Sequence, residues 1–183
     1  MANEYSYERF KSSSKYYFFV FNQKNAAMTR AGVDKYLTIL QNFDRNNLDA
    51  LCECVSVDVR FVDPFNDVSG RTAYRTIFSD MLDNLENHEF EVITIVWSDN
   101  IVQKECAKRD AVVFLKWRLS AMLPRLLDAE WEVTGCTELR VNQEGFVTAH
   151  IDYWDPSHGL YEKLPFIGWI FRFLRRRLQS SQK

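Results

Sequence analysis

The sequence predicts an α+β domain in which N-terminal helices cover one face of a curved antiparallel sheet. Three observations favour this fold class. Apolar residues recur at helical spacing in the first half of the chain, they alternate with polar residues in the second half, and a hairpin-type turn joins the last two alternating runs. This order of elements is typical of an α+β cone that leaves a pocket between helices and sheet.

Length and composition bound the function classes. The 183 residues suit one domain, and a hydrophobic share of 46% is ample for one core. A formal net charge of −2 gives no global attraction to nucleic acid, so we expect no nucleic-acid partner. Zinc-ligand spacing is absent among Cys52, Cys54, Cys106 and Cys136, which predicts free thiols, no metal site and a cytoplasmic location.

The first half of the chain should contain two helices and a strand. Residues 1–27 differ in composition from the rest of the chain, and we interpret them as an N-terminal arm. Helices are expected over residues 29–43, capped by Thr29, and over 47–54. A strand over 57–63 comes next, ended by a proline. Its alternation places four side chains on one side: Val57, Val59, Phe61 and Asp63.

The second half should contain a third helix and then only strands. The helix is expected from Arg71 to Leu85, where apolar residues recur at helical spacing. Asn142 to Gly145 is a hairpin-type turn between the last two strands. Four strands are expected, over residues 89–97, 111–122, 129–141 and 146–154.

The last expected strand carries the clearest candidate site. Its alternation gives one hydrophobic face, made of Val147, Ala149, Ile151 and Tyr153. The other face mixes an imidazole, a carboxylate and an indole, and it consists of Thr148, His150, Asp152 and Trp154. Such a face either looks at water or lines a polar cavity. Asp155 precedes a proline and is expected to be a turn residue.

Two segments carry a resemblance to a known family. The segment NNLDALCECVSVDVRFVDPFNDVSGRTAYRTIF resembles the helix, strand and helix entry of the nuclear-transport-factor-2-like superfamily, which includes SnoaL-like polyketide cyclases and ketosteroid isomerases. The likeness continues through TELRVNQEGFVTAHIDYW and covers residues 33–155. It implies a cystatin-like cone over residues 28–156, a small hydrophobic ligand and a homodimer.

The resemblance also implies roles for single residues. Asp63 falls on the general base of the isomerases, immediately before the same proline. The isomerases use a tyrosine and a protonated aspartate as donors to the developing enolate. Here Ile39 stands at the tyrosine position, with Tyr36 one helical turn earlier, and Thr137 stands at the aspartate position. These departures argue against ketosteroid isomerisation itself.

Together these patterns give a candidate site and two function hypotheses. The first is a cofactor-free isomerase or lyase acting on a small hydrophobic carbonyl or hydroxyl compound, with Asp63 as base, His150 as acid or base and Asp152 as its orienter. The second is a non-catalytic ligand-binding or membrane-associated interaction domain. The expected pocket wall consists of Tyr36, Phe61, Tyr74, Phe78, Trp131, Thr137 and Trp154.

A structural role is an open alternative for each of these three ionisable residues. Asp63 has the position of a carboxylate that caps its own turn. His150 has the position of an interior histidine whose ring nitrogens are satisfied, and Asp152 that of a solvated carboxylate.

The C-terminal residues 157–183 are expected to form a basic amphipathic helix. Its predicted span is Pro165 to Leu178, and it carries an apolar stripe together with clustered arginines. One interpretation docks the stripe on this domain or on a second copy. The other places the helix in the plane of a membrane, at the periphery. The candidate membrane or partner residues are Trp169, Arg172, Arg175, Arg176 and Arg177.

Overall fold

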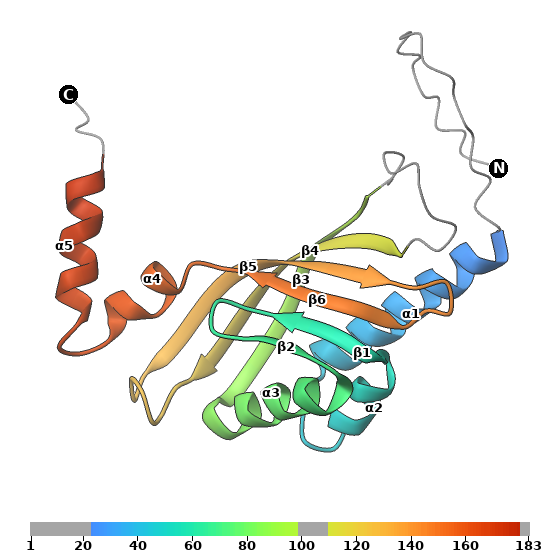
Figure 1. Cartoon of the computed structure of the whole chain (residues 1–183). Coiled ribbons are helices and arrows are strands. Elements are labelled where there is room, and N and C mark those ends of the chain that lie inside the picture. The colour runs from blue at the N-terminus through green and yellow to red at the C-terminus, as the bar shows by residue number, and fades with distance from the viewer. Residues whose placement is uncertain (1–22, 99–109, 180–183) are drawn as a thin grey trace, which may run out of the picture.

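The computed structural model describes residues 23–98 and 110–179, which form one curved, unclosed sheet with helices on one face (Figure 1). The expected α+β cone is confirmed. Three N-terminal helices gather under the sheet: α1 (Gln23–Gln41), α2 (Leu48–Glu53) and α3 (Arg71–Asn84). Most of the expected arm, and Cys106, lie outside the described residues.

The sheet has six strands in the order β2-β1-β6-β5-β4-β3. β6 pairs in parallel with β1 and antiparallel with β5, so the last strand in the chain is central in the sheet. The short strand β2 is not among the strands expected from the sequence. The strand bounds are β1 Val55–Val62, β2 Asp67–Ser69, β3 Glu86–Ser98, β4 Ala111–Met122, β5 Glu130–Val141 and β6 Val147–Tyr153.

The expectation for Thr29 is wrong. Helix α1 begins at Gln23, so Thr29 lies inside the helix rather than at its cap. Its side chain is buried, and its hydroxyl donates to the carbonyl oxygen of Asn142 at 3.1 Å. Thr29 therefore ties α1 to the turn between β5 and β6.

Irregularities in β1 and β6 change which side chains point inward. The pairing of β1 with β6 shifts between Val55 and Arg60, and Val57 is 75% exposed, so it does not share the buried side of Val59 and Phe61 as expected. In β6 the register shifts next to Val147, which becomes fully buried.

The shift in β6 also corrects the expectation for Thr148. The Thr148 hydroxyl donates to the Asp110 carboxylate and lies 3.3 Å from the carbonyl oxygen of Arg140, so it takes no part in the contacts of His150. His150 and Asp152 lie opposite Leu139 and Thr137 of β5, on the inward side as predicted.

After β6 the chain leaves the sheet and forms three short helices: α4 (Pro156–Gly159), the 3-10 helix η1 (Tyr161–Lys163) and α5 (Gly168–Leu178). Asp155 caps α4, accepting from the backbone N–H of Ser157 at 2.8 Å, which agrees with the expected turn role. Pro165 precedes α5 instead of opening it, and Phe166 between them has φ 70°. In Figure 1, α5 stands away from the sheet.

Candidate functional site

His150 lies at the centre of the site because β6 carries it between β1 and β5, facing the helices. Only 3% of the residue is exposed. Its Nδ1 lies 2.6 Å from the Tyr36 hydroxyl, which in turn lies 2.7 Å from the Tyr74 hydroxyl. Its Nε2 lies 3.0 Å from Asp152 Oδ1. Both ring nitrogens therefore have partners, as the alternative of a satisfied interior histidine requires.

Asp152 receives a second hydrogen bond from the opposite side. The Thr137 hydroxyl donates to the same Oδ1 atom, and the Trp117 indole N–H donates to that hydroxyl at 2.7 Å. Within the described residues, no hydrogen bond reaches the other carboxylate oxygen, Oδ2. These contacts thus hold Asp152 through one oxygen.

For an imidazole that carries one proton, the hydrogen bonds have one direction. A carboxylate only accepts, so His150 Nε2–H donates to Asp152 and leaves Nδ1 to accept from Tyr36. Tyr36 then accepts from Tyr74. Burial raises the pKa of both tyrosines well above the ordinary value for a phenol, so both hydroxyls keep their protons. The imidazole of His150 thus lies between a phenol and a carboxylate.

An open hollow of about 530 Å³ lies where β1 and β6 end. Asp63, Asp152, Trp154 and Asp155 are among its lining residues. Asp152 is therefore the member of the hydrogen-bonded chain that reaches the surface, with 17% of its side chain exposed against 4% for His150. Of the two residues, Asp152 lines the hollow and His150 does not.

Asp63 lines the same hollow but is engaged locally. Its carboxylate accepts from the backbone N–H of Phe65 at 2.7 Å and from that of Asn66 at 2.6 Å. The Asn66 side-chain amide adds contacts of 3.1 Å to both carboxylate oxygens. This is the turn-capping arrangement that the sequence left as an alternative. The structure brings Asp63 to the hollow and not into the hydrogen bonds of His150.

The expected pocket wall divides into two groups. The rings of Phe61 and Phe78 pack on His150 with centroids 5.1 and 6.1 Å away, so these residues lie with Tyr36 and Tyr74 in the core. Trp131 instead donates to the carbonyl oxygen of Gly159 at 2.7 Å, and its ring contacts Trp154. Trp131 and Trp154 thus pack next to the start of the C-terminal segment, and Trp154 also lines the hollow.

Sequence reasoning missed Trp117 as a member of the site. Trp117 lies in β4 between the exposed cations Lys116 and Arg118. This alternation indicates only that the Trp117 side chain faces inward. Its pairing with Thr137 needs the register of β4 against β5, in which Leu115 is opposite Thr137. Among the described residues, no group of three or more His, Cys, Asp or Glu side chains is arranged to hold a metal ion.

The sequence matches a known family. The sequence profile of the SnoaL-like domain matches residues 33–150, which is more than half of the chain. The chain belongs to the SnoaL-like domain family. The matched span begins in α1 and ends at His150, so it includes most of the hydrogen-bonded chain and stops before Asp152 and the C-terminal segment. No curated protein sequence matches the chain.

Solved structures support the same SnoaL-like fold. An NTF2-like protein of unknown function from Exiguobacterium sp. 255-15 is 14% identical with a TM-score of 0.55, covering 68% of this chain and 98% of its own. A hypothetical protein with a ketosteroid isomerase-like fold from Catenulispora acidiphila, in complex with trimethylamine, is 16% identical with a TM-score of 0.57, covering 74% and 93%. An LEH-like epoxide hydrolase from M. tuberculosis is 16% identical with a TM-score of 0.54, covering 85% and 96%. At such identities the likeness shows the fold alone.

Proposed function

We propose that this SnoaL-like protein is a cofactor-free isomerase or lyase that acts on a small hydrophobic carbonyl or hydroxyl compound through the Asp152 carboxylate. The observation that carries the proposal is the position of Asp152 at the end of a buried hydrogen-bonded chain and at the wall of an open hollow. Membership of the SnoaL-like domain family supports the proposal, as does the same fold in a putative polyketide cyclase from Xanthomonas campestris. So does the epoxide hydrolase of the same fold, because it places small-molecule chemistry on this architecture.

The proposed chemistry is a proton transfer between atoms of one substrate. Asp152 Oδ2 accepts a proton from the carbon next to the substrate carbonyl, and the electron pair of that C–H bond moves toward the carbonyl oxygen. The resulting carboxylic acid returns the proton either to another carbon, which completes an isomerisation, or to a departing hydroxyl, which completes a dehydration. His150 and Thr137 hold Oδ1 throughout, so the carboxylate is fixed in orientation.

The roles therefore differ from those expected from sequence. Asp152, expected to orient His150, becomes the proposed base because it reaches the hollow. His150 becomes a positioning residue, since it is buried and both of its ring nitrogens are occupied. Asp63 is the rival base, because it lines the same hollow.

The proposal is tested by proton exchange in deuterated buffer with a panel of cyclic enones and hydroxy-ketones. NMR would follow deuterium entering the carbon next to the carbonyl, together with any isomerised or dehydrated product. Asp152→Asn removes the base and keeps the shape of the side chain. We expect it to lower the exchange rate roughly 100-fold or more, the ordinary contribution of a positioned general base.

Two variants serve as comparisons. Asp128→Asn is the matched control, because Asp128 is exposed in the turn between β4 and β5 with φ 48°, a conformation that asparagine also adopts. Asp63→Asn tests the rival base. Full activity in Asp152→Asn together with loss in Asp63→Asn would reject Asp152 as the base, and no exchange with any compound would reject the activity on this substrate class.

A non-catalytic ligand-binding function is the second candidate, and one observation favours it. Tyr36 and Tyr74 are fully buried, and the hollow is open rather than enclosed. A shallow site of this kind excludes little water, which weakens electrostatic catalysis. Saturation-transfer NMR that detects binding of panel compounds, without exchange or product, would favour this second function.

A further inference from the structure

The last helix, α5, is fixed to the domain along one side only. Its main contacts are with η1, and in Figure 1 it projects from the domain beyond α4. On the attached side the Phe171 ring packs on Tyr161 with centroids 5.0 Å apart. Gly168 is buried there, and a side chain at that position would collide with the carbonyl oxygen of Glu162. The attached side is therefore closely packed.

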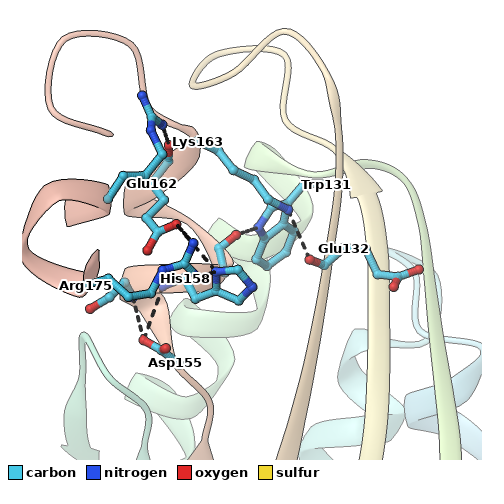
Figure 2. Close-up of polar contacts among 10 residues, drawn as sticks. Trp131, Glu132, Asp155, His158, Glu162, Lys163 and Arg175 are labelled. Carbon is cyan, nitrogen blue, oxygen red and sulfur yellow. Dashed lines mark hydrogen bonds and ion pairs between the residues drawn. The ribbon is translucent and has the colours of Figure 1, made fainter. Parts of the chain in front are cut away.

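Two of the four arginines hold this attachment. Arg175 forms an ion pair with Glu162 at 2.9 Å, and its guanidinium lies 2.7 Å from His158 Nδ1. Arg172 donates to the carbonyl oxygen of Glu162. Figure 2 shows Arg175, His158 and Glu162 gathered above Asp155, next to Trp131. Because Glu162 is only 8% exposed, this cluster sets the orientation of α5 on the domain.

The rest of the helix surface has large apolar side chains that the domain leaves exposed. Trp169 and Phe173 are one turn apart and are 62% and 52% exposed. Ile170 and Leu174 form a second exposed pair beside them, and Phe166, in the loop before the helix, is 91% exposed. The expectation that the apolar stripe docks on its own domain is thus not what the described residues show. A surface of this kind needs a partner.

The charge of the segment indicates what kind of partner. Residues 165–183 contain five of the 23 Lys and Arg residues and none of the 25 Asp and Glu residues. Arg176 and Arg177 come after the exposed apolar pairs, and the Arg177 guanidinium lies 5.5 Å above the Phe173 ring. Aromatic rings beside long cationic side chains suit the boundary between acyl chains and anionic head groups.

We propose that α5 is an interfacial membrane helix that binds the surface of an anionic bilayer. Trp169, Phe173 and Phe166 enter the acyl boundary, and Arg176 and Arg177 contact lipid phosphates. Parallel pairing with a second copy of α5 is disfavoured, since it would bring two arginine-rich ends together. In the described part of the chain, no helix is long and apolar enough to cross a bilayer, so the helix lies in the plane.

The test is co-sedimentation of the full chain with vesicles of phosphatidylcholine alone and of phosphatidylcholine with about 30% phosphatidylserine, a content at which a leaflet carries a marked negative potential. We expect binding to the anionic vesicles only, weakened by added salt. Arg176→Glu with Arg177→Glu should lower the partition constant at least about tenfold. Trp169→Ser with Phe173→Ser should lower it by a similar factor by removing the inserted rings.

Matched controls separate this surface from general charge. Lys116→Glu with Arg125→Glu makes the same change of charge at exposed positions outside the C-terminal segment and should leave binding unchanged. Circular dichroism confirms folding of each variant. Absence of sedimentation with anionic vesicles, or an equal loss in the control, would overturn the proposal. A third outcome would also overturn it: the protein is a dimer without lipid, the double variant Trp169→Ser with Phe173→Ser dissociates that dimer, and the vesicles bind no protein. In that case α5 would contact a second copy.

Discussion

The Thr137 hydroxyl takes part in two buried hydrogen bonds at once. Its hydroxyl donates to Asp152 and accepts from the Trp117 indole, and the residue is 1% exposed. A hydroxyl can make both bonds at once, whereas a methyl group can make neither. The side chain at this position therefore connects the core of the sheet to the carboxylate at the hollow.

At the residue scale we predict that Thr137→Val destabilises the protein by about 1–3 kcal/mol, because it leaves the buried Trp117 N–H without an acceptor. Urea unfolding of the variant measures the loss. Thr134→Val is the matched control, since Thr134 lies on the same strand with its side chain exposed, and it should change the free energy of unfolding by less than about 0.5 kcal/mol. Equal losses in both variants would contradict the role given to Thr137.

At the scale of elements, α1 and the hairpin turn between β5 and β6 meet through two glycines. A Cβ on Gly32 would come within 2.1 Å of the carbonyl oxygen of Gly145. Gly145 itself has φ 88°, as a turn of this type requires. The Thr29 hydroxyl bonds the carbonyl oxygen of Asn142 in the same turn. The close approach fixes α1, and with it Tyr36, against the strand that carries His150.

Gly32→Ala gives a test in which two physical effects have opposite signs. Helix propensity alone favours alanine by about 1 kcal/mol. The contact with backbone atoms of the turn opposes it, and overpacking of this kind costs about 1–3 kcal/mol or more. Because backbone atoms cannot rotate away, we expect a net loss of stability, seen as a lower midpoint in thermal unfolding. An increase in the midpoint would show that α1 does not approach the turn this closely.

Elements with a regular period are the ones that the sequence could predict. The alternation of β4 gives both of its ends correctly, and the placement of His150 and Asp152 on one face of β6 follows from spacing alone. The irregular strands could not be predicted, because a register shift such as the one between Val55 and Arg60 leaves no mark in composition. Spacing also could not show whether Asp63 lines a pocket or caps its own turn. That depends on whether the backbone N–H groups of Phe65 and Asn66 point at its carboxylate, which only the folded turn shows.

At the scale of the whole molecule, two buried phenols couple stability to alkaline pH. Burial raises the folded-state pKa of Tyr36 and Tyr74 above the ordinary value of 10.0. A group with a raised pKa contributes its full stability below the unfolded pKa and loses it as pH rises. Above about pH 10 the unfolded chain therefore releases protons that the folded chain keeps, and each tyrosine lowers the free energy of unfolding by about 1.4 kcal/mol per pH unit.

We predict that Tyr36→Phe flattens this alkaline decline, because it removes one of the two phenols. Urea unfolding at pH 9, 10 and 11 measures the slope for each protein. Tyr153→Phe changes an exposed tyrosine and should leave the slope at its original value. Equal slopes for all three proteins would indicate that Tyr36 ionises as readily in the folded chain as in the unfolded one.

The central position of β6 has a consequence for how the protein is made. β6 is the last strand to be synthesised, yet it pairs with β1, so that Val55 lies beside Val147. The two strands that flank it have no partner on that side until β6 has been synthesised, and His150 cannot contact Tyr36 before then. Pairing over so many residues slows folding, typically to milliseconds or seconds. A nascent chain that is stalled before β6 would thus present two open strand edges, which are sites for chaperones or for aggregation.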